Sequence, residues 1–569
     1  MDSQRVLLYF SLVLTLFLIW SAWQRDYGPR PDPSPASQST NQTRALPAGD
    51  MSNNRADVPQ SPVVPENVGG IAEPRAATAG GRRIRVVTDV LDIEIDTEGG
   101  DIRRAALPTY PANADDPDEP FVLMHSDPAL GVYIAQSGLV HDRTAHGGTG
   151  EHLAPTHHAI YTAARDEYRL RAGEDELRVP LTWQGPSGVL VRKVFTFHRR
   201  DFLIDVSHTV VNRSEQAWSG RQYRQLRHGP IRDEDKSMLL YTYTGAAYYD
   251  GHYEKVPFDD MQGEGLSREI TGGWAAMLEH YFVSAWVPRA NERNFYYTNV
   301  VREGGQPQYI IGLRSAALNV APNASGTFNT RIFVGPKLQE HLDEIAQGLD
   351  LVVDYGIFTV LAKPLFWALE KIHDVVGNWG WAIVILTLLI KLAFYKLSET
   401  SYKSMARMRN VQPRMAALRE RYANDKQKMN QALMELYKTE KINPLGGCLP
   451  ILVQIPVFIS LYWMLLESVE MRQADFMLWI NDLSSRDPFF ILPLLMGVTM
   501  FIQQKLNPAP LDPIQAKVMM VLPVVFTVFF AFFPSGLVLY WFVNNLLSIA
   551  QQWVITKRIE RGVKPAEQD

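Results

Sequence analysis

A lysine, Lys391, lies within an otherwise apolar stretch that is long enough to cross a lipid bilayer. The stretch spans residues 378–397 and reads NWGWAIVILTLLIKLAFYKL. A charged side chain inside a membrane segment is energetically costly, so such residues usually mark a functional site. The chemistry that an ammonium group predicts here is electrostatic, namely the transient attraction of a negatively charged group. The sequence therefore raises the question of which ligand a buried cation would meet.

Further polar side chains recur in the apolar segments that follow. Thr387 lies one helical turn before Lys391, Gln454 lies in the next apolar segment, and Asn544 and Ser548 share one side of the last segment. Polar side chains in hydrocarbon seek one another or water, so these groups predict a hydrated cavity that opens toward the cytoplasm. The alternative is that Lys391 extends its ammonium to the cytoplasmic head groups. The remaining polar side chains of this set are Gln503, Gln504, Gln551 and Gln552.

The elements that must position these groups are apolar segments at about 378–397, 446–466, 489–504, 517–533 and 536–556. The third and fourth fall below the ~20 apolar residues that a spanning helix needs, which favours local thinning of the bilayer. An earlier apolar run lies within residues 1–23. We interpret it as a retained N-terminal anchor, because Trp20 and Trp23 stand where a cleavage site would need small residues.

Loop charges predict the orientation of these spans. Residues 398–445 carry ten Lys and Arg against five Asp and Glu, whereas residues 467–488 carry two against five. The positive-inside rule places the first loop in the cytoplasm and the second outside. Counting spans from there places both termini, including the tail 558–569, in the cytoplasm. The large domain that precedes the core then lies outside the membrane, on the periplasmic side.

The cytoplasmic loop 398–445 is predicted to form a helical hairpin, since two apolar stripes at helical spacing flank a turn near Asp425. The stripes either join the two helices or hold varied partners. The basic outer face either contacts the ribosome or lipid head groups or is an ordinary solvated surface. Its basic residues include Arg407, Arg409, Arg414, Arg419, Arg421, Lys426 and Lys428.

The first part of the chain divides into three segments. Residues 24–80 are rich in Pro, Ser, Asn and Gln and predict a disordered linker. Residues 81–340 alternate apolar and polar positions with turn residues between, as in KVFTFHRRDFLIDVSHTVVN, and predict an all-β sandwich. Residues 341–377 change to helical spacing and predict an amphipathic helix on the outer membrane surface; the alternative is a surface helix of the β-domain.

Several functional classes are disfavoured by what the sequence lacks. Its one cysteine, Cys448, permits no internal disulfide and no cysteine-based metal site. The sequence has no Gly-rich phosphate loop, so an internal ATPase is not expected, and a net charge of −5 does not suggest binding to DNA. The histidines His152, His157 and His158 lack helical spacing and nearby carboxylates, so we interpret them as a solvated loop and expect neither metal nor cofactor.

Three motifs resemble the membrane core of the YidC insertase family. They are INPLGGCLPILVQIPVFISLYWML (442–465), ILPLLMGVTMFIQQK (491–505) and FPSGLVLYWFVNNLLSIAQQ (533–552). The resemblance covers essentially the full chain and corresponds to the Gram-negative form. It implies a polytopic α-helical membrane protein with six spans, of which five form an insertase core at 378–557. It also implies a galactose-mutarotase-like β-sandwich in the periplasm.

The resemblance also implies a function. Members of this family insert inner-membrane proteins and help them to fold, alone or with the Sec translocon and its accessory subunits. They act through a hydrophilic groove open to the cytoplasm, without bond chemistry, so we expect no enzymatic activity. The implied partners are nascent membrane proteins, the Sec translocon, the ribosome and inner-membrane lipids.

Family positions of the groove carry over residue by residue. Lys391 matches the groove cation, which is Arg in many members, and Thr387 matches a groove-lining position. A lysine cannot form the bidentate fork of Arg with a carboxylate, so a loose electrostatic role is expected. The remaining residues implied for the groove are Ile455, Pro456 and Phe458, which face substrate, and Trp541, which stands where Tyr is common. The polar pattern adds Gln454, Asn544 and Ser548.

The sequence is also compatible with two other functional classes. A transporter or channel would use the same polar cavity and would be favoured by a repeat between helix pairs, which we do not find. A sugar-binding or epimerase activity of the sandwich would need an acid and a base paired in a cleft. The sequence of the β-domain assigns no such pair.

Overall fold

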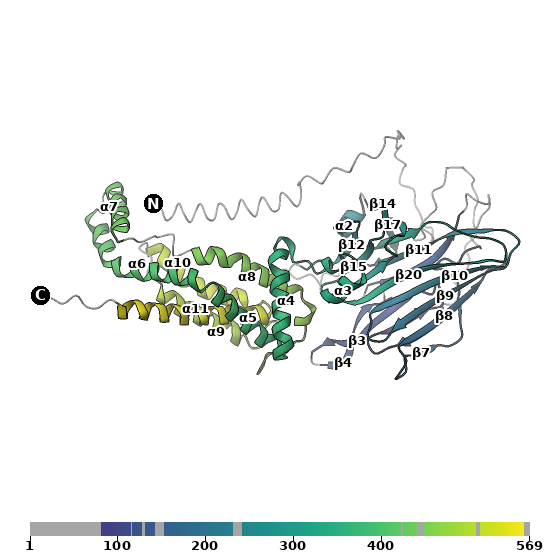
Figure 1. Cartoon of the computed structure of the whole chain (residues 1–569), viewed down its shortest axis with the longest axis horizontal. Helices are drawn as coiled ribbons and strands as arrows, with labels where there is room; N and C mark the ends of the chain where they lie inside the picture. The colour runs from purple at the N-terminus through teal and green to yellow at the C-terminus, as the bar shows by residue number, and fades with distance from the viewer. Residues whose placement is uncertain are drawn as a thin grey trace, which may run out of the picture. The chain divides into compact units, whose positions relative to one another are not determined.

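The computed structural model describes residues 81–114, 116–127, 131–142, 153–231, 242–263, 265–422, 425–440, 449–507 and 513–562 (Figure 1). The predicted N-terminal anchor (1–23) and linker (24–80) lie outside the described residues. So do Cys448 and the end of the chain from residue 563.

The first half of the described chain forms two packed, largely antiparallel sheets, as the alternating pattern predicted. Among the described residues, the first sheet contains in spatial order β14 (Ser267–Thr271), β17 (Arg293–Glu303), β18 (Gln306–Ser315), β11 (Trp218–His228), β5 (Tyr133–His141), β3 (Ile102–Asn113), β2 (Asp92–Asp96), β1 (Arg83–Val87) and β7 (Glu167–Arg169), with β19 (Leu318–Val320) beside β11 and β4 (Asp116–Met124) beside β3. The second sheet contains β13 (Tyr253–Val256), β12 (Gly245–Tyr249), β15 (Trp274–Leu278), β16 (Phe282–Val287), β20 (Ser325–Pro336), β10 (Leu203–Asn212), β9 (Val189–His198), β8 (Glu176–Gln184) and β6 (Thr162–Ala163).

Strands β9 and β10 show why this sequence forms a sandwich. They pair antiparallel with Ile204 opposite Phe197. Successive side chains of a strand point to opposite faces. Phe195 and Phe197 are therefore buried in the core between the sheets, whereas Val194 and Thr196 lie on the outer face. Burial of the apolar face stabilises the domain by roughly 25 cal/mol per Å² removed from water.

The interpretation of the histidine cluster as a solvated loop is wrong for His157. Its side chain is 1% exposed. Its backbone N–H donates to the Tyr223 hydroxyl at 2.8 Å, and its ring Nδ1 lies 2.6 Å from the same oxygen. Tyr223 comes from the distant strand β11, so this burial has no local sequence signal. His152 lies outside the described residues, and no group of three potential metal ligands occurs within the described ranges.

The segment predicted as one amphipathic helix at 341–377 is broken into shorter pieces. They are α3 (Gln339–Ile345), the 3₁₀ turns η4 (Leu349–Val352) and η5 (Gly356–Phe358), and α4 (Thr359–Val376). Pro364 lies in the second turn of α4. The buried face of α4 carries Ala362, Phe366 and Leu369, which pack with the helical core. A short helix, α2 (Phe258–Met261), lies within the sandwich sequence.

The second half of the described chain is helical. Its elements are α5 (Trp379–Ala393), α6 (Tyr395–Arg421), α7 (Lys426–Thr439), α8 (Leu449–Glu467), the 3₁₀ turn η7 (Val469–Met471), α9 (Ile491–Leu506), α10 (Pro513–Phe530) and α11 (Ser535–Gly562). The predicted continuous span 378–397 is wrong at its C-terminal end, because α5 stops at Ala393 and α6 continues at an angle of 67°. Within the described residues, no helix alone combines the length and apolar composition for a membrane crossing, whereas the bent pair α5–α6 does.

Candidate functional site

Helix α5 holds Lys391 in its last turn, and its start is fixed by Asn378. The Asn378 side-chain oxygen accepts from the backbone N–H of Trp381 at 3.0 Å, which caps the helix. The side-chain amide of Asn378 donates to the backbone oxygen of Asp475 at 3.0 Å. The cap therefore joins α5 to the loop that follows α8, and this contact sets the axial position of Lys391.

The ammonium of Lys391 is bound to helix α11. It donates to the Ser548 hydroxyl at 2.7 Å, and Ser548 in turn donates to the backbone oxygen of Asn544 at 2.7 Å. Ser548 is 3% exposed. Among the described residues Lys391 forms no ion pair with a carboxylate. The cation therefore lies at a helix interface with a neutral partner and not beside an acid.

A second hydrogen bond extends this polar contact to helix α8. The side-chain amide of Gln454 donates to the Asn544 side-chain oxygen at 2.7 Å. Four predicted residues from three helices thus meet in one network. We call it the polar cluster: Lys391, Gln454, Asn544 and Ser548. Polar groups in an apolar surrounding are costly unless they are hydrogen-bonded, so this network satisfies side chains that the sequence placed in separate segments.

Three other predicted polar positions do not join the cluster. Thr387 is 1% exposed, and its hydroxyl donates within its own helix to the Ile383 backbone oxygen at 2.7 Å. Gln552 donates to the backbone oxygen of Leu506 at 3.2 Å and so joins α11 to the end of α9. The buried side-chain amide of Gln551 has no hydrogen-bond partner within the described part of the chain.

The predicted apolar contact residues lie on α8 and α11. Phe458 packs edge-on against Trp541, with ring centroids 4.4 Å apart, and Trp541 also contacts Phe530 of α10 at 5.0 Å. Ile455 is 38% exposed and Pro456 is half-buried on the same helix. Aromatic packing therefore holds Phe458 and Trp541 in the core, whereas Ile455 is available at the surface of α8.

The basic hairpin forms as expected, with α6 packed on α7. Val411 and Met415 are buried against Leu433, Leu436 and other residues of this small apolar cluster. The stripes thus join the two helices. The basic side chains that are exposed are those of Arg407, Arg409, Arg414, Arg421 and Lys428, whereas Arg419 is half-buried and the Lys426 side chain lies outside the described residues.

The basic surface of the hairpin is partly neutralised by acids. Arg414 pairs with Glu440 at 2.6 Å, and Lys428 pairs with Asp425 at 3.3 Å. Both pairs are largely exposed, and such pairs contribute little to stability. The charge of the hairpin surface is therefore available to a partner at small cost.

Buried polar residues near the start of α6 and in the middle of α11 were not predicted. Ser398 and Ser401 of α6 are 8% and 3% exposed, although their segment was interpreted as a cytoplasmic loop. Asn545 of α11 approaches the Thr499 hydroxyl of α9 at 3.5 Å. The i, i+3 spacing of the two serines is consistent with one buried helix face, but only the packing of α6 against α11 identifies that face.

The chain matches two family models. Residues 83–368 match the model of the YidC periplasmic domain, and residues 371–562 match the model described as 60Kd inner membrane protein.

Full-length relatives and a solved structure are also similar. Membrane protein insertase YidC from Thioalkalivibrio sulfidiphilus (strain HL-EbGR7) is 61% identical over 99% of this chain and 100% of the relative. The protein of the same name from Methylococcus capsulatus (strain ATCC 33009 / NCIMB 11132 / Bath) is 49% identical over 100% of both chains. A crystal structure described as an active YidC insertase with the first transmembrane domain resolved has a TM-score of 0.37 and 18% identity, and it covers 83% of this chain and 92% of the other.

Proposed function

This chain belongs to the YidC family of membrane protein insertases of the bacterial inner membrane, and we propose that it inserts its clients by holding their polar leaders at the polar cluster around Lys391. The observation that supports this proposal is the hydrogen bond from Lys391 to the neutral Ser548 hydroxyl. The cation has no acidic partner among the described residues, so a client can supply one. The nascent membrane protein is then the substrate.

The exchange of partners at Lys391 is energetically small, as transient binding requires. A neutral hydrogen bond contributes about 0.5–1.5 kcal/mol and one between charged groups about 1.5–3 kcal/mol. A client carboxylate therefore displaces Ser548 with a modest gain. A lysine cannot form the bidentate pair that Arg makes with a carboxylate. Binding of the client leader by Lys391 is therefore not specific for one sequence, as varied clients require.

The apolar part of the client moves along exposed faces of the core. Ile455 of α8 is 38% exposed, and Val524 and Val525 of α10 are 64% and 55% exposed. The 16 residues of α9 span about 24 Å at ~1.5 Å per residue, less than the ~30 Å of a typical hydrocarbon core. A locally thinned bilayer beside the polar cluster lowers the cost of moving a polar leader across.

Partition of the client into lipid drives its release. The membrane potential assists by ~2.3 kcal/mol per charge per 100 mV when an acidic leader moves outward. No step makes or breaks a bond, so the activity needs no cofactor and is not enzymatic.

The proposal includes the topology and the other partners. Both termini and the α6–α7 hairpin lie in the cytoplasm, six spans cross the membrane, and the hairpin meets ribosomes or lipid head groups through its exposed arginines. The protein acts alone or with the Sec translocon. The resemblance of the β-sandwich to galactose mutarotases remains a prediction, and the Thr387 position lines the groove without joining the polar cluster.

The test measures insertion of a single-span client in cells depleted of their own insertase. The client carries either an acidic or a neutral leader, and the protein is wild type, Lys391→Arg or Lys391→Ala. We expect the Lys391→Arg protein to insert both clients. We expect the Lys391→Ala protein to fail to insert the acidic client alone. Lys396→Ala is the matched control, because the Lys396 side chain is 92% exposed five residues away. If Lys391→Ala inserts both clients as well as wild type does, the electrostatic mechanism is wrong.

A further inference from the structure

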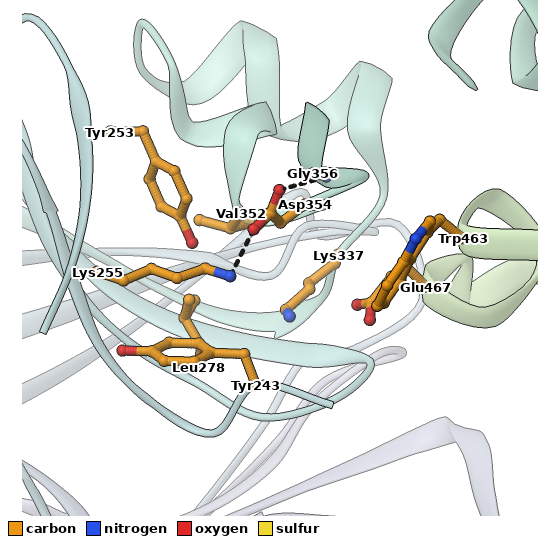
Figure 2. Close-up of a pocket in the computed structure, with 10 residues that line it drawn as sticks. All are labelled: Tyr243, Tyr253, Lys255, Leu278, Lys337, Val352, Asp354, Gly356, Trp463 and Glu467. Atoms are coloured by element: carbon orange, nitrogen blue, oxygen red, sulfur yellow. Dashed lines mark hydrogen bonds and ion pairs between the residues drawn. The ribbon is translucent and has the colours of Figure 1, made fainter. Parts of the chain in front are cut away.

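A charged cavity lies where the β-domain, the connection to α4 and the end of α8 meet. Its volume is about 130 Å³. Figure 2 shows its lining. The residues come from β13 and β15, from the segments just before β12 and just after β20, from the two 3₁₀ turns and their connection, and from α8. They are Tyr243, Tyr253, Lys255, Leu278, Lys337, Val352, Asp354, Gly356, Trp463 and Glu467. We call it the junction cavity.

Two of the four charged residues of the junction cavity satisfy each other. Lys255 donates to Asp354 at 2.5 Å, and its ammonium also lies 4.5 Å from the centre of the Tyr243 ring. Asp354 in addition accepts from the backbone N–H of Gly356 at 2.7 Å. This pair needs no further partner.

The other two charged residues, Lys337 and Glu467, are the more deeply buried. They are 3% and 7% exposed, and Figure 2 shows both side chains directed into the cavity with no dashed line to either. Within the described residues neither side chain makes a hydrogen bond or a direct ion pair, although the backbone N–H of Lys337 donates to the Tyr281 backbone oxygen at 2.9 Å. Burial lowers the pKa of Lys337 to about 8, and the negative charge of Glu467 opposes this shift. Burial likewise raises the pKa of Glu467 to about 7, and the positive charge of Lys337 opposes that shift. A counter-charge inside the cavity therefore stabilises the charged form of each group.

Buried charges without partners are costly, which points to a polar occupant of the junction cavity. The two unpaired groups are one cation and one anion, and the remaining pair is neutral overall. The fitting occupant thus carries one charge of each sign and no net charge. The cavity has room for at least about four waters at ~30 Å³ each, which suits a small polar headgroup.

The surroundings of the cavity indicate that its occupant is amphiphilic. Gly356 lines the cavity, and the next residue, Ile357, is 80% exposed, followed by Val360 at 83%. The cavity is also lined by Trp463 of the core helix α8, an aromatic type enriched at membrane interfaces. A charged cavity beside exposed apolar residues matches the two ends of a phospholipid.

We propose that the junction cavity binds the headgroup of a zwitterionic phospholipid of the phosphoethanolamine type. The phosphate accepts from Lys337, and the ligand's ammonium donates to Glu467 beside the Trp463 ring, which favours a cation over its face. The acyl chains lie along Ile357 and Val360. This site is separate from the polar cluster, so it stands or falls independently of the insertion mechanism.

The test uses the full-length protein, purified with depleted lipid, and native mass spectrometry. Phosphatidylethanolamine and phosphatidylglycerol with identical acyl chains are added in equal amounts. We expect wild type to retain one phosphatidylethanolamine with about tenfold preference, a difference of about 1.4 kcal/mol. Lys337→Met abolishes this preference. Glu467→Gln reverses it toward phosphatidylglycerol, because the unpaired cation then faces a neutral amide.

Controls separate binding from folding. Lys337→Arg keeps the positive charge and is expected to retain the preference even if the methionine variant unfolds. Lys363→Met changes a lysine of neighbouring α4, which is already paired with Asp350, and is expected to behave as wild type.

Three outcomes would overturn the proposal. Equal retention of both lipids by wild type excludes a zwitterion site, and retention of no lipid leaves only water in the cavity. If soluble glycerophosphoethanolamine displaces the lipid when both are at the same concentration, the acyl chains gain no affinity from the apolar residues beside the cavity.

Discussion

Replacing Arg472 with methionine is expected to loosen the contact between the loop after α8 and the β3–β4 hairpin. The guanidinium of Arg472 donates to the backbone oxygens of Pro111 at 2.6 Å and Ala112 at 3.2 Å. It also lies 5.3 Å from the centre of the Phe121 ring and 5.7 Å from that of Phe282. Methionine preserves much of the apolar stem and removes all four polar contacts.

The size of the effect follows from these contacts. A hydrogen bond from a charged donor contributes about 1.5–3 kcal/mol, and each cation–π contact at a partly exposed site contributes about 0.5–1 kcal/mol. Arg472 is half-buried, and its second hydrogen bond is long and exposed. Solvent screening reduces the sum, so we expect the local contact to weaken by about 2–4 kcal/mol. This corresponds to about a 30- to 1,000-fold increase in local opening.

Hydrogen exchange of the full-length protein measures this opening. Backbone amides of β3, β4 and the loop 467–488 should exchange faster by this factor, while those of β9 and β10 remain unchanged. Arg486→Met is the matched control, because Arg486 is an exposed arginine of the same loop. Unchanged exchange in Arg472→Met, or an equal increase in the control, would refute the assignment of this contact to the guanidinium.

Three further predictions concern single residues of the helical core and of the β-domain. Ser548→Ala should preserve or increase insertion of acidic clients, because Lys391 loses a competing neutral partner worth about 1 kcal/mol; reduced insertion would contradict this. Gly380→Ala should destabilise the start of α5, seen as a lower melting temperature, because an added Cβ would lie 2.1 Å from Phe476. Burial lowers the pKa of Lys193 in the β-domain to about 8. The unfolded chain therefore binds a proton that the folded chain lacks between about pH 8 and the ordinary lysine value of ~10.4, so the free energy of unfolding should rise over this range by up to ~1.4 kcal/mol per pH unit. The free energy of unfolding is measured by urea titration at several pH values, with hydrogen exchange in the β-domain as the readout. The Lys193→Met protein should lack this rise.

The sequence allowed the two structural classes to be predicted because their signals are local. A period of two residues places Phe195 and Phe197 on one face of a strand whatever lies opposite, and the observed register of β9 and β10 agrees. The helical hairpin was equally predictable from the sequence, because the apolar stripes around Met415 and Leu433 have helical spacing. Lys391 was conspicuous for the same reason: a charge within an apolar run is visible without knowing its neighbours.

Other features depended on contacts between distant residues. The burial of His157 needs Tyr223, 66 residues later, and no pattern near the histidine reports it. The bend after Ala393 also escaped prediction, because the apolar run continues through it and hydropathy does not encode direction.

The sequence by itself determined which residues are apolar or charged, the periods of the strands and helices, and the presence of a cation within an apolar run. Only the tertiary structure decided the partners of those charges. Lys391 meets Ser548 across 157 residues, and Lys337 shares a cavity with Glu467 although they belong to different halves of the chain. The physical reason is that secondary structure follows from neighbours in sequence, whereas the environment of a buried charge follows from which surfaces pack together.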